Sequence, residues 1–236
     1  MKDFKIKIFA DGANLEDIKR LYKLPYVKGF TTNPTLMRKA GIQSYESFSK
    51  ELLSLIQDLP VSLEVFADDA ESILYQARKI ASWGKNVYVK IPVSTTDGKF
   101  LGEVIRTLSH ENIPLNITAL MTADQVEDVL DCLKADVPNI ISVFAGRIAD
   151  TGRDPLETMT KCHYLIKESG KQAELLWASP RELYNVIQAE QMGCEIITVD
   201  KGILDKLSLI GKDLLEYSQE TVQMFYKDAL ASAFQI

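Results

Sequence analysis

The sequence predicts an α/β protein: a (β/α)8 TIM barrel with an additional C-terminal helix. Short runs rich in β-branched residues alternate with longer segments of helical periodicity along the whole chain. No Gly-, Pro- or Ser-rich linker interrupts the 236 residues, a length that one such barrel routinely occupies. We therefore expect a single barrel domain over residues 1–236. A doubly wound sheet is the alternative, although it usually has fewer strands.

Eight segments have the composition of strands in a parallel sheet. They are residues 5–10, 29–32, 62–66, 86–92, 115–119, 140–144, 174–178 and 195–199. Apolar residues recur at helical spacing between them, for example over residues 45–56, where Ser44 is a candidate N-cap. Thr122 is a candidate N-cap for the helical segment that contains Val126 and Val129.

A helical tail, residues 213–234, follows the last predicted strand. It carries more apolar residues than one small helix needs, namely Leu214, Leu215, Val222, Phe225, Tyr226 and Leu230. Two interpretations stay open: the tail packs on its own barrel, or it docks on a neighbouring subunit.

Composition excludes several classes of function. The net charge of −6 provides no basic footprint for nucleic acid or for an anionic membrane surface. No apolar run approaches the roughly 20 residues of a membrane span, and the N-terminus lacks a signal-peptide pattern. We therefore expect a cytoplasmic protein with neither nucleic acid nor membrane as a partner.

Cysteine and histidine usage predicts no metal site. Cys132, Cys162 and Cys194 lie far apart without a C-x-x-C motif, and we expect reduced thiols. His110 and His163 are the only two histidines. No glycine-rich nucleotide-binding motif follows any strand.

In a (β/α)8 barrel the reactive residues lie at the carboxyl ends of the strands and in the loops that follow. The polar residues at these positions are Asp11, Asn33, Glu64, Lys90, Asn116, Thr118, Ser142, Arg147, Ser179 and Arg181.

Lys90 is the most informative of them. Strand alternation in VYVKIPV puts Val89 and Ile91 on one face and Lys90 on the other, which in a covered barrel strand is the lumen. Burial disfavours the ammonium form, and a Schiff-base nucleophile has to be unprotonated. An ion-paired structural lysine and a snorkelling lysine on an edge strand are the alternatives.

Two carboxylates and two arginines extend the candidate site. Asp11 closes the first predicted strand and Glu64 lies inside the third, where they are either structural ion-pair partners or acid/base groups for imine chemistry. Arg147 and Arg181 follow the sixth and seventh strands, the usual phosphate corner of this fold. Surface salt bridges are the alternative for both arginines.

The chain resembles the transaldolase family of class I aldolases. The motifs that carry the resemblance run through nearly the whole chain: FADGAN, GFTTNPTLM, LEV, VKIPV, NITAL, ISVFAGRI and ASPRE. The length resembles the short, single-barrel branch that includes the fructose-6-phosphate aldolases. That branch is typically decameric, so the resemblance implies a homo-oligomer, a decamer or pentamer, whose C-terminal helix reaches a neighbour.

The resemblance also implies roles for the matched residues. Lys90 would form the imine with a ketose C2 carbonyl, Asp11 would take the C4 hydroxyl proton, and Glu64 and Thr118 would hold the water that relays protons. Asn33, Asn116 and Ser142 would bind the dihydroxyacetone part. Arg147, Ser179 and Arg181 would hold the phosphate. No cofactor is implied, because Lys90 itself supplies the electron sink.

Lumen residues divide the family into two branches. The fructose-6-phosphate aldolases carry Gln where this chain has Glu64 and Tyr where it has Phe144, and they lack equivalents of Asn116 and Ser142. This chain therefore has the transferase pattern. It departs from the family at Gly12, commonly Thr or Ser, and at Pro180, commonly a larger apolar residue.

We therefore expect a transaldolase. It would move a dihydroxyacetone unit from sedoheptulose 7-phosphate or fructose 6-phosphate to glyceraldehyde 3-phosphate or erythrose 4-phosphate, as in the pentose phosphate pathway. One alternative is an aldolase that needs no acceptor. The other is a non-catalytic sugar-phosphate-binding barrel, against which the joint presence of Lys90, Asp11, Glu64 and Thr118 argues.

Overall fold

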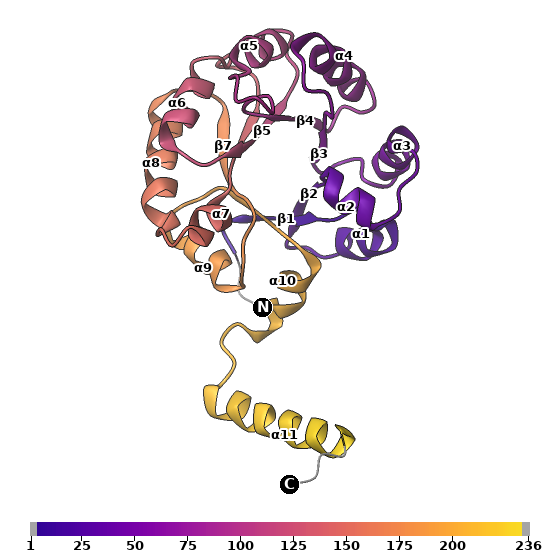
Figure 1. Ribbon diagram of the computed structural model, residues 1–236, viewed down its shortest axis with the longest axis vertical. Coiled ribbons are helices and arrows are strands. Elements are labelled where there is room, and N and C mark those ends of the chain that lie inside the picture. Colours follow the sequence, from indigo (N-terminus) through magenta and orange to yellow (C-terminus); the bar gives the residue numbers. More distant parts are fainter. Residues whose placement is uncertain (1–3, 233–236) are drawn as a thin grey trace.

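The computed structural model describes residues 4–232. Eight parallel strands form a closed barrel in which each strand pairs with the next and β8 pairs with β1 (Figure 1). The strands are β1 (Lys7–Asp11), β2 (Val27–Thr31), β3 (Val61–Glu64), β4 (Val87–Pro92), β5 (Leu115–Leu120), β6 (Asn139–Val143), β7 (Ala173–Trp177) and β8 (Ile196–Val199). The predicted (β/α)8 fold is confirmed.

Helices cover the outside of the barrel. They are α1 (Leu15–Tyr22), α2 (Pro34–Lys39), α3 (Tyr45–Leu55), α4 (Ala70–Ala81), α5 (Gly102–His110), α6 (Ala123–Leu130), α7 (Ala145–Asp150), α8 (Pro155–Glu168), α9 (Tyr184–Gln191) and α10 (Lys201–Asp205), with a 3-10 turn at Lys206–Leu209. Both predicted N-caps are confirmed, since Ser44 accepts from the Ser47 N–H and Thr122 forms a capping box with Gln125.

The strand limits differ from the predicted ones by up to two residues. The third strand was expected to reach residue 66 but ends at Glu64, because the N–H groups of Phe66 and Ala67 donate to the side chain of Gln76 on α4 instead of to a strand. Glu64 therefore closes β3 rather than lying inside it. The fifth strand runs one residue further than expected, to Leu120, past an irregularity at Ala119, which has a left-handed φ of 65°.

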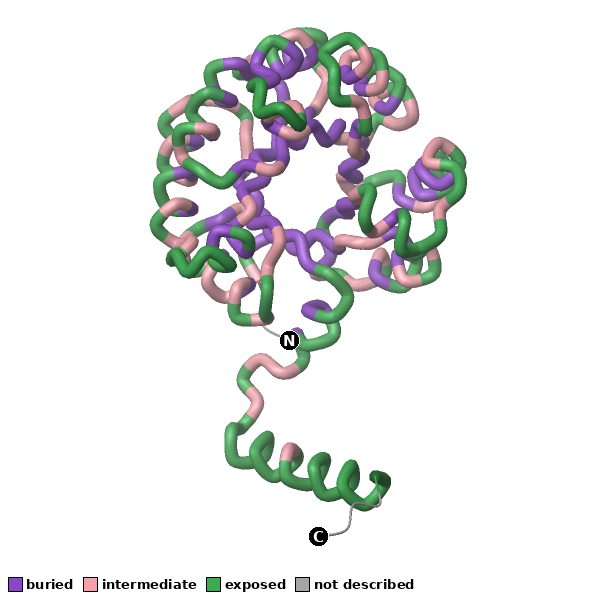
Figure 2. The backbone as a smooth tube through the Cα atoms, viewed as in Figure 1, coloured by how far each residue is buried: buried purple, intermediate pink, exposed green. Residues whose placement is uncertain are grey.

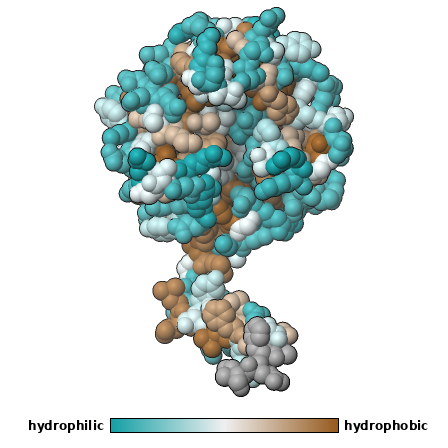
Figure 3. All heavy atoms as spheres, in the orientation of Figure 1, coloured by the Kyte–Doolittle hydropathy of each residue, from teal (hydrophilic) through white to brown (hydrophobic). Residues whose placement is uncertain are grey.

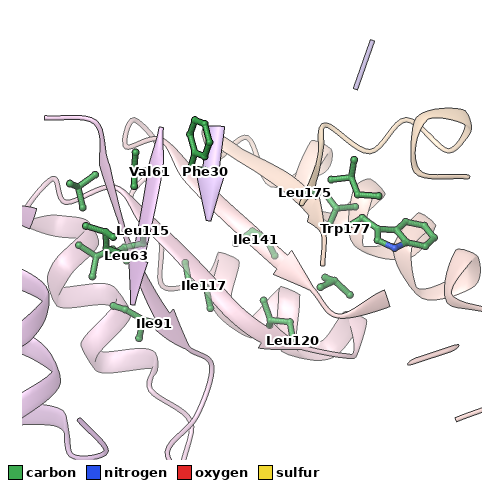
Figure 4. Close-up of a cluster of buried hydrophobic side chains, with 14 of the residues drawn as sticks. Phe30, Val61, Leu63, Ile91, Leu115, Ile117, Leu120, Ile141, Leu175 and Trp177 are labelled. Atoms are coloured by element: carbon green, nitrogen blue, oxygen red, sulfur yellow. The ribbon is translucent and has the colours of Figure 1, made fainter. Parts of the chain in front are cut away.

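Two apolar layers hold the barrel. The outer layer packs strand residues against the helices and includes Val61, Leu63, Ile91, Ile117 and Trp177 (Figure 4). The inner layer fills the lumen with the side chains of Phe9, Ile140, Leu176, Ala178 and Ile196. In Figure 2 the strands that carry these side chains form a ring of mostly buried residues. The inner layer closes the lumen below the carboxyl ends of the strands, so polar side chains gather above it.

Gly29 makes room for this inner layer. A Cβ at Gly29 would lie 2.6 Å from the ring of Phe9, which crosses the lumen from β1. Any larger residue at this position of β2 would displace the aromatic ring that fills the barrel.

The final helix, α11 (Leu214–Ser232), stands away from the barrel (Figure 1). None of its described residues is buried, and Leu214 and Leu215 are 80% and 82% exposed. Figure 3 shows hydrophobic side chains gathered on this segment. The structure thus does not have the tail packed on its own barrel; residues 233 and 234 of the predicted tail lie outside the described part of the chain.

Cys132, Cys162 and Cys194 are free thiols, and all three are buried. Among the helices of residues 4–232, none is long and apolar enough to cross a membrane.

Candidate active site

A cavity of about 630 Å³ opens at the carboxyl ends of the strands. Every residue singled out from the sequence lines it: Asp11, Asn33, Glu64, Lys90, Asn116, Thr118, Ser142, Phe144, Arg147, Ser179 and Arg181. A hollow of similar volume, about 640 Å³, lies outside the barrel between α3 and α4. Its Glu46 carboxylate is only half-buried and is paired with Lys50 and Lys79.

Lys90 is held in the lumen by strand register. The parallel pairing sets Glu64 of β3 opposite Lys90 of β4, and Lys90 opposite Asn116 of β5. Paired residues of neighbouring strands point to the same side of a sheet, so all three face the cavity. Lys90 is 8% exposed, and its Nζ lies 3.1 Å from Glu64 Oε2 and donates to the Thr32 carbonyl at 3.3 Å.

Asp11 ends β1 at the cavity, and side chains from the end of β2 and from the N-cap of α2 contact its two oxygens. Thr31 Oγ1 donates to Oδ1 at 2.8 Å, and Asn33 Nδ2 lies 3.5 Å from Oδ2. The Oδ1 atom of Asn33 caps α2 by accepting from the Leu36 N–H, which turns its amide nitrogen toward Asp11. The carboxylate of Asp11 is thus held by Thr31 and Asn33 and lines the cavity.

Burial raises the pKa of Asp11 above its ordinary value. The positive charge of Lys90 and the hydrogen bond from Thr31 oppose that shift, while the carboxylates of Asp200 and Glu64 add to it. A carboxylate with a raised pKa is a stronger base than an ordinary aspartate.

A chain of buried hydrogen bonds fixes the floor of the cavity beside Lys90. Ser142 Oγ donates to Asn116 Oδ1 at 2.6 Å, and Asn116 Nδ2 donates to Ser62 Oγ at 2.9 Å. These bonds leave one amide hydrogen of Asn116 and the lone pairs of Ser142 for a ligand.

Two buried polar atoms at the cavity have no hydrogen-bond partner among the described residues: Thr118 Oγ1 and Glu64 Oε2. Glu64 Oε2 contacts Lys90 as an ion pair without hydrogen-bond alignment. Since buried polar atoms are nearly always satisfied, each of these two atoms is available to a water or a ligand hydroxyl.

Arg147 and Arg181 both line the cavity, but only Arg181 is paired with a carboxylate. Within residues 4–232 no carboxylate lies in ion-pair distance of Arg147, and its guanidinium carbon is 5.5 Å from the centre of the Phe144 ring. Arg147 belongs to the short helix α7, not to a loop as the sequence suggested. Arg181 is engaged by Asp150, with Nε donating to Oδ1 at 2.9 Å and Nη2 donating to Oδ2.

The loop after β7 approaches α7 very closely. A Cβ on Gly146 would lie 1.6 Å from the carbonyl oxygen of Ser179, and Ser179 itself has a left-handed φ of 60°. Left-handed backbone in a non-glycine residue is strained and recurs at functional sites. Only glycine at position 146 permits the approach that sets Ser179 beside the two arginines.

Comparison with known sequences identifies the family. The family described as Transaldolase/Fructose-6-phosphate aldolase matches residues 8–236. A protein of Dehalococcoides mccartyi named probable transaldolase is 38% identical over 199 residues, which are 84% of this chain and 88% of that protein. A probable transaldolase of Methanococcus maripaludis is 38% identical over 202 residues, 86% of this chain and 89% of that protein.

The chain belongs to the transaldolase/fructose-6-phosphate aldolase family. A Streptococcus equi protein of the same name is 36% identical over 86% of this chain and 90% of its own length. Since the curated relatives are named probable transaldolases, the chain is an enzyme of the transaldolase family.

Solved structures support the fold alone. A dihydrodipicolinate synthase from Rhodopseudomonas palustris superposes with a TM-score of 0.61 at 14% identity, over 95% of this chain and 79% of that chain. A protein titled KGPDC from Streptococcus mutans gives a TM-score of 0.57 at 13% identity, over 86% of this chain and 90% of that chain. Such low identities carry no information about the reaction of this family member.

Sequence reasoning missed four residues of this transaldolase-family site. Thr31 and Thr198 line the cavity, with their hydroxyl oxygens 2.5 Å apart. Because Thr31 donates to Asp11, Thr198 is the donor in that pair. Gly146 and Asp150 lie on α7 and contact the loop after β7. Thr31 stands next to the TNP motif and could have been found there, whereas the other three carry no local signal.

Proposed function

We propose that this enzyme is a transaldolase with a Schiff-base mechanism. It moves a dihydroxyacetone unit from sedoheptulose 7-phosphate or fructose 6-phosphate to glyceraldehyde 3-phosphate or erythrose 4-phosphate. One observation carries the proposal: an amine, that of Lys90, is buried beside a carboxylate at the mouth of a barrel whose cavity also holds Asp11 and two arginines.

Imine formation uses the groups around Lys90. The unprotonated Nζ adds to the ketose C2 carbonyl, and loss of water from the carbinolamine leaves an iminium. A water held between the unpartnered atoms of Glu64 and Thr118 carries protons to and from the departing oxygen. The same water hydrolyses the imine at the end of the cycle.

Carbon–carbon cleavage uses Asp11. Its carboxylate takes the proton of the C4 hydroxyl, the C3–C4 bond breaks, an aldose phosphate leaves, and the electron pair moves into the iminium to give an enamine on Lys90. The enamine then attacks the aldehyde of the acceptor, and Asp11 returns the proton. Asn33, Asn116 and Ser142 hold the hydroxyl groups of the three-carbon unit.

The phosphate lies at the corner formed by Arg147, Ser179 and Arg181. Replacing either arginine with Ala should raise KM for fructose 6-phosphate about 10- to 150-fold, since a charge-assisted hydrogen bond is lost. Borohydride trapping of dihydroxyacetone, which has no phosphate, should be unchanged. The measurements are steady-state kinetics and mass spectrometry of the trapped enzyme.

Arg153→Ala is the matched control for these variants. Arg153 follows α7, donates to Thr151 Oγ1 at 2.8 Å and does not line the cavity. Its kinetics should match the wild type. Equal losses on phosphorylated and unphosphorylated substrates would give the two cavity arginines a structural role instead.

Glu64 and Phe144 are expected to decide between transfer and release. The enamine is either captured by an aldehyde or protonated and released as dihydroxyacetone. The Phe144 ring offers no hydrogen bond to a water near the imine, so protonation is slow. The variant Glu64→Gln/Phe144→Tyr adds a hydroxyl group beside the imine and removes the carboxylate that would deprotonate it. We expect release of dihydroxyacetone from fructose 6-phosphate to rise about tenfold relative to transfer. This ratio corresponds to a change of ~1.4 kcal/mol in the difference between the two barriers.

Product partitioning with and without erythrose 4-phosphate measures this ratio. Phe144→Leu is the control, since it keeps an apolar side chain and adds no hydroxyl. An unchanged ratio in the double variant, with Lys90 still trapped by borohydride, would show that these side chains do not set the outcome.

The test of the function as a whole is borohydride reduction with a panel of ketose phosphates, followed by peptide mapping. Turnover of the donor that depends on an added aldose phosphate supports the transferase. Turnover without acceptor indicates an aldolase. Binding of ketose phosphates with no trapped adduct indicates a sugar-phosphate-binding barrel, and rejects the proposal.

We also propose that the enzyme is a homo-oligomer, a pentamer or decamer. The exposed apolar side chains of α11, such as Leu214, Leu215 and Phe225, form a surface that a second copy would cover. Sedimentation velocity of the full chain tests this, and a monomer at micromolar concentration would reject it.

A further inference from the structure

The guanidinium of Arg181 is bound by a residue that does not line the cavity, Asp150. Its Nε and Nη2 donate to the two carboxylate oxygens of Asp150, the last residue of α7, and its backbone N–H donates to Asn185 Oδ1 at 2.7 Å. Arg181 lines the cavity, whereas Asp150 does not. The carboxylate therefore binds the edge of the guanidinium that is turned away from the cavity.

This geometry leaves a second edge of the guanidinium available. A guanidinium has five N–H bonds in a planar fork, and a carboxylate on the Nε–Nη2 edge leaves both hydrogens of Nη1 and one of Nη2. No described residue accepts from Nη1. The free edge has the spacing to bind two oxygens of a phosphate.

From this arrangement we infer that Asp150 is a positioning residue: it orients the free edge of Arg181 toward the substrate phosphate. The inference rests on the proposed function only for the identity of the phosphate as that of a ketose. Asp150 makes no contact with the cavity and acts through Arg181 alone.

Charge supports a positioning role. Hydrogen bonds from Arg181 hold the pKa of Asp150 below its ordinary value, so the carboxylate is ionised throughout the working pH range. With Asp150 paired to Arg181, the free positive charge at the corner is that of Arg147. Because Asp150 offsets its charge, Arg181 would contribute directed N–H donors to phosphate binding more than net positive charge.

The pair contributes little to the stability of the fold. The side chains of Arg181 and Asp150 are 46% and 53% exposed, and ion pairs at such exposure add little free energy of folding. Removing the carboxylate should therefore leave a folded enzyme in which Arg181 samples other rotamers.

Asp150→Asn tests the inference, because it keeps the shape and removes the charge. We expect KM for fructose 6-phosphate to rise about three- to tenfold with kcat within about twofold of the wild type, as for one lost orienting contact. Trapping of dihydroxyacetone should be unchanged. In an Arg181→Ala background the same change should have no further effect, since its target is gone.

Asp154→Asn is the matched control. Asp154 lies in the segment between α7 and α8, caps α8 by accepting from the Leu156 N–H, and does not contact Arg181. Its KM should equal that of the wild type. A lower KM in Asp150→Asn would show that the carboxylate competes with the phosphate, and an equal rise in the Arg181→Ala background would show an effect unrelated to Arg181; either result overturns the inference.

Affinity for inorganic phosphate, measured by calorimetry, separates this inference from the proposed function. Weaker phosphate binding by Asp150→Asn than by the wild type supports the positioning role even if no borohydride adduct forms. Equal phosphate affinity in the two proteins rejects it even if the enzyme proves to be a transaldolase.

Discussion

Lys90→Met is expected to abolish borohydride trapping and to lower transfer activity by more than about 10³-fold. The thioether is close in shape to the lysine stem but has no nitrogen to form the imine, and no other described amine stands beside a buried carboxylate at the cavity. Lys90→Arg should be equally inactive, because a guanidinium stays protonated. Trapping is followed by intact-mass spectrometry and peptide mapping.

Lys39→Met provides the matched control for this variant, because Lys39 lines the same cavity from the end of α2 but is exposed. It should trap like the wild type. Since Lys90→Met leaves Glu64 without its ion-pair partner, Lys90→Met/Glu64→Gln removes both charges of the pair and tests the same point without an unpaired carboxylate at position 64. A folded Lys90 variant that still forms an adduct at another lysine would contradict the Schiff-base assignment.

Asp11→Asn is expected to lower kcat for cleavage about 10²- to 10⁴-fold while raising the melting temperature at neutral pH. The loss follows because an amide cannot take the C4 hydroxyl proton. The gain follows because burial disfavours the carboxylate: the native protein binds this proton more tightly than the unfolded chain does. Lys90 trapping should persist, since imine formation does not use Asp11.

The pH dependence of this site has a defined sign. The pKa of Asp11 is higher in the folded protein than in the unfolded chain. Its negative charge therefore does not destabilise the fold at pH values below the pKa of the unfolded chain. The destabilisation develops as pH rises through the pKa of the folded protein. The stability advantage of Asp11→Asn should accordingly shrink as pH is lowered. In the wild type, kcat should fall on the acid side at a higher pH than the pKa of an ordinary aspartate would give. Thr31→Val removes a hydrogen-bond donor to Asp11 and should move this fall to a still higher pH.

Melting curves of wild type and Asp11→Asn from acidic to neutral pH, together with kcat profiles, measure both effects. A variant less stable than the wild type at neutral pH would mean that Lys90 and Thr31 more than offset the cost of burial. Full activity in Asp11→Asn would remove Asp11 from the proton transfer.

Much of the fold and most of the site follow from the sequence, for physical reasons that act locally. Strand periodicity of two residues decides which side chains face the lumen, and this put Lys90 there from VYVKIPV alone. The rule that reactive groups follow the carboxyl ends of barrel strands selected residues that line one cavity in the folded protein. Ser44 and Thr122 are N-caps because their hydroxyls satisfy N–H groups within three residues.

Only the tertiary structure decided which of these residues are neighbours. The ion pair of Lys90 with Glu64 depends on the register between strands and on closure of the barrel, which no local pattern encodes. The contact of Gly146 with Ser179 and the ion pair of Asp150 with Arg181 join α7 to the loop after β7, about 30 positions further along the chain. Alternation and capping act within a few residues and can be predicted from sequence, whereas contacts across the barrel appear only once the chain has closed.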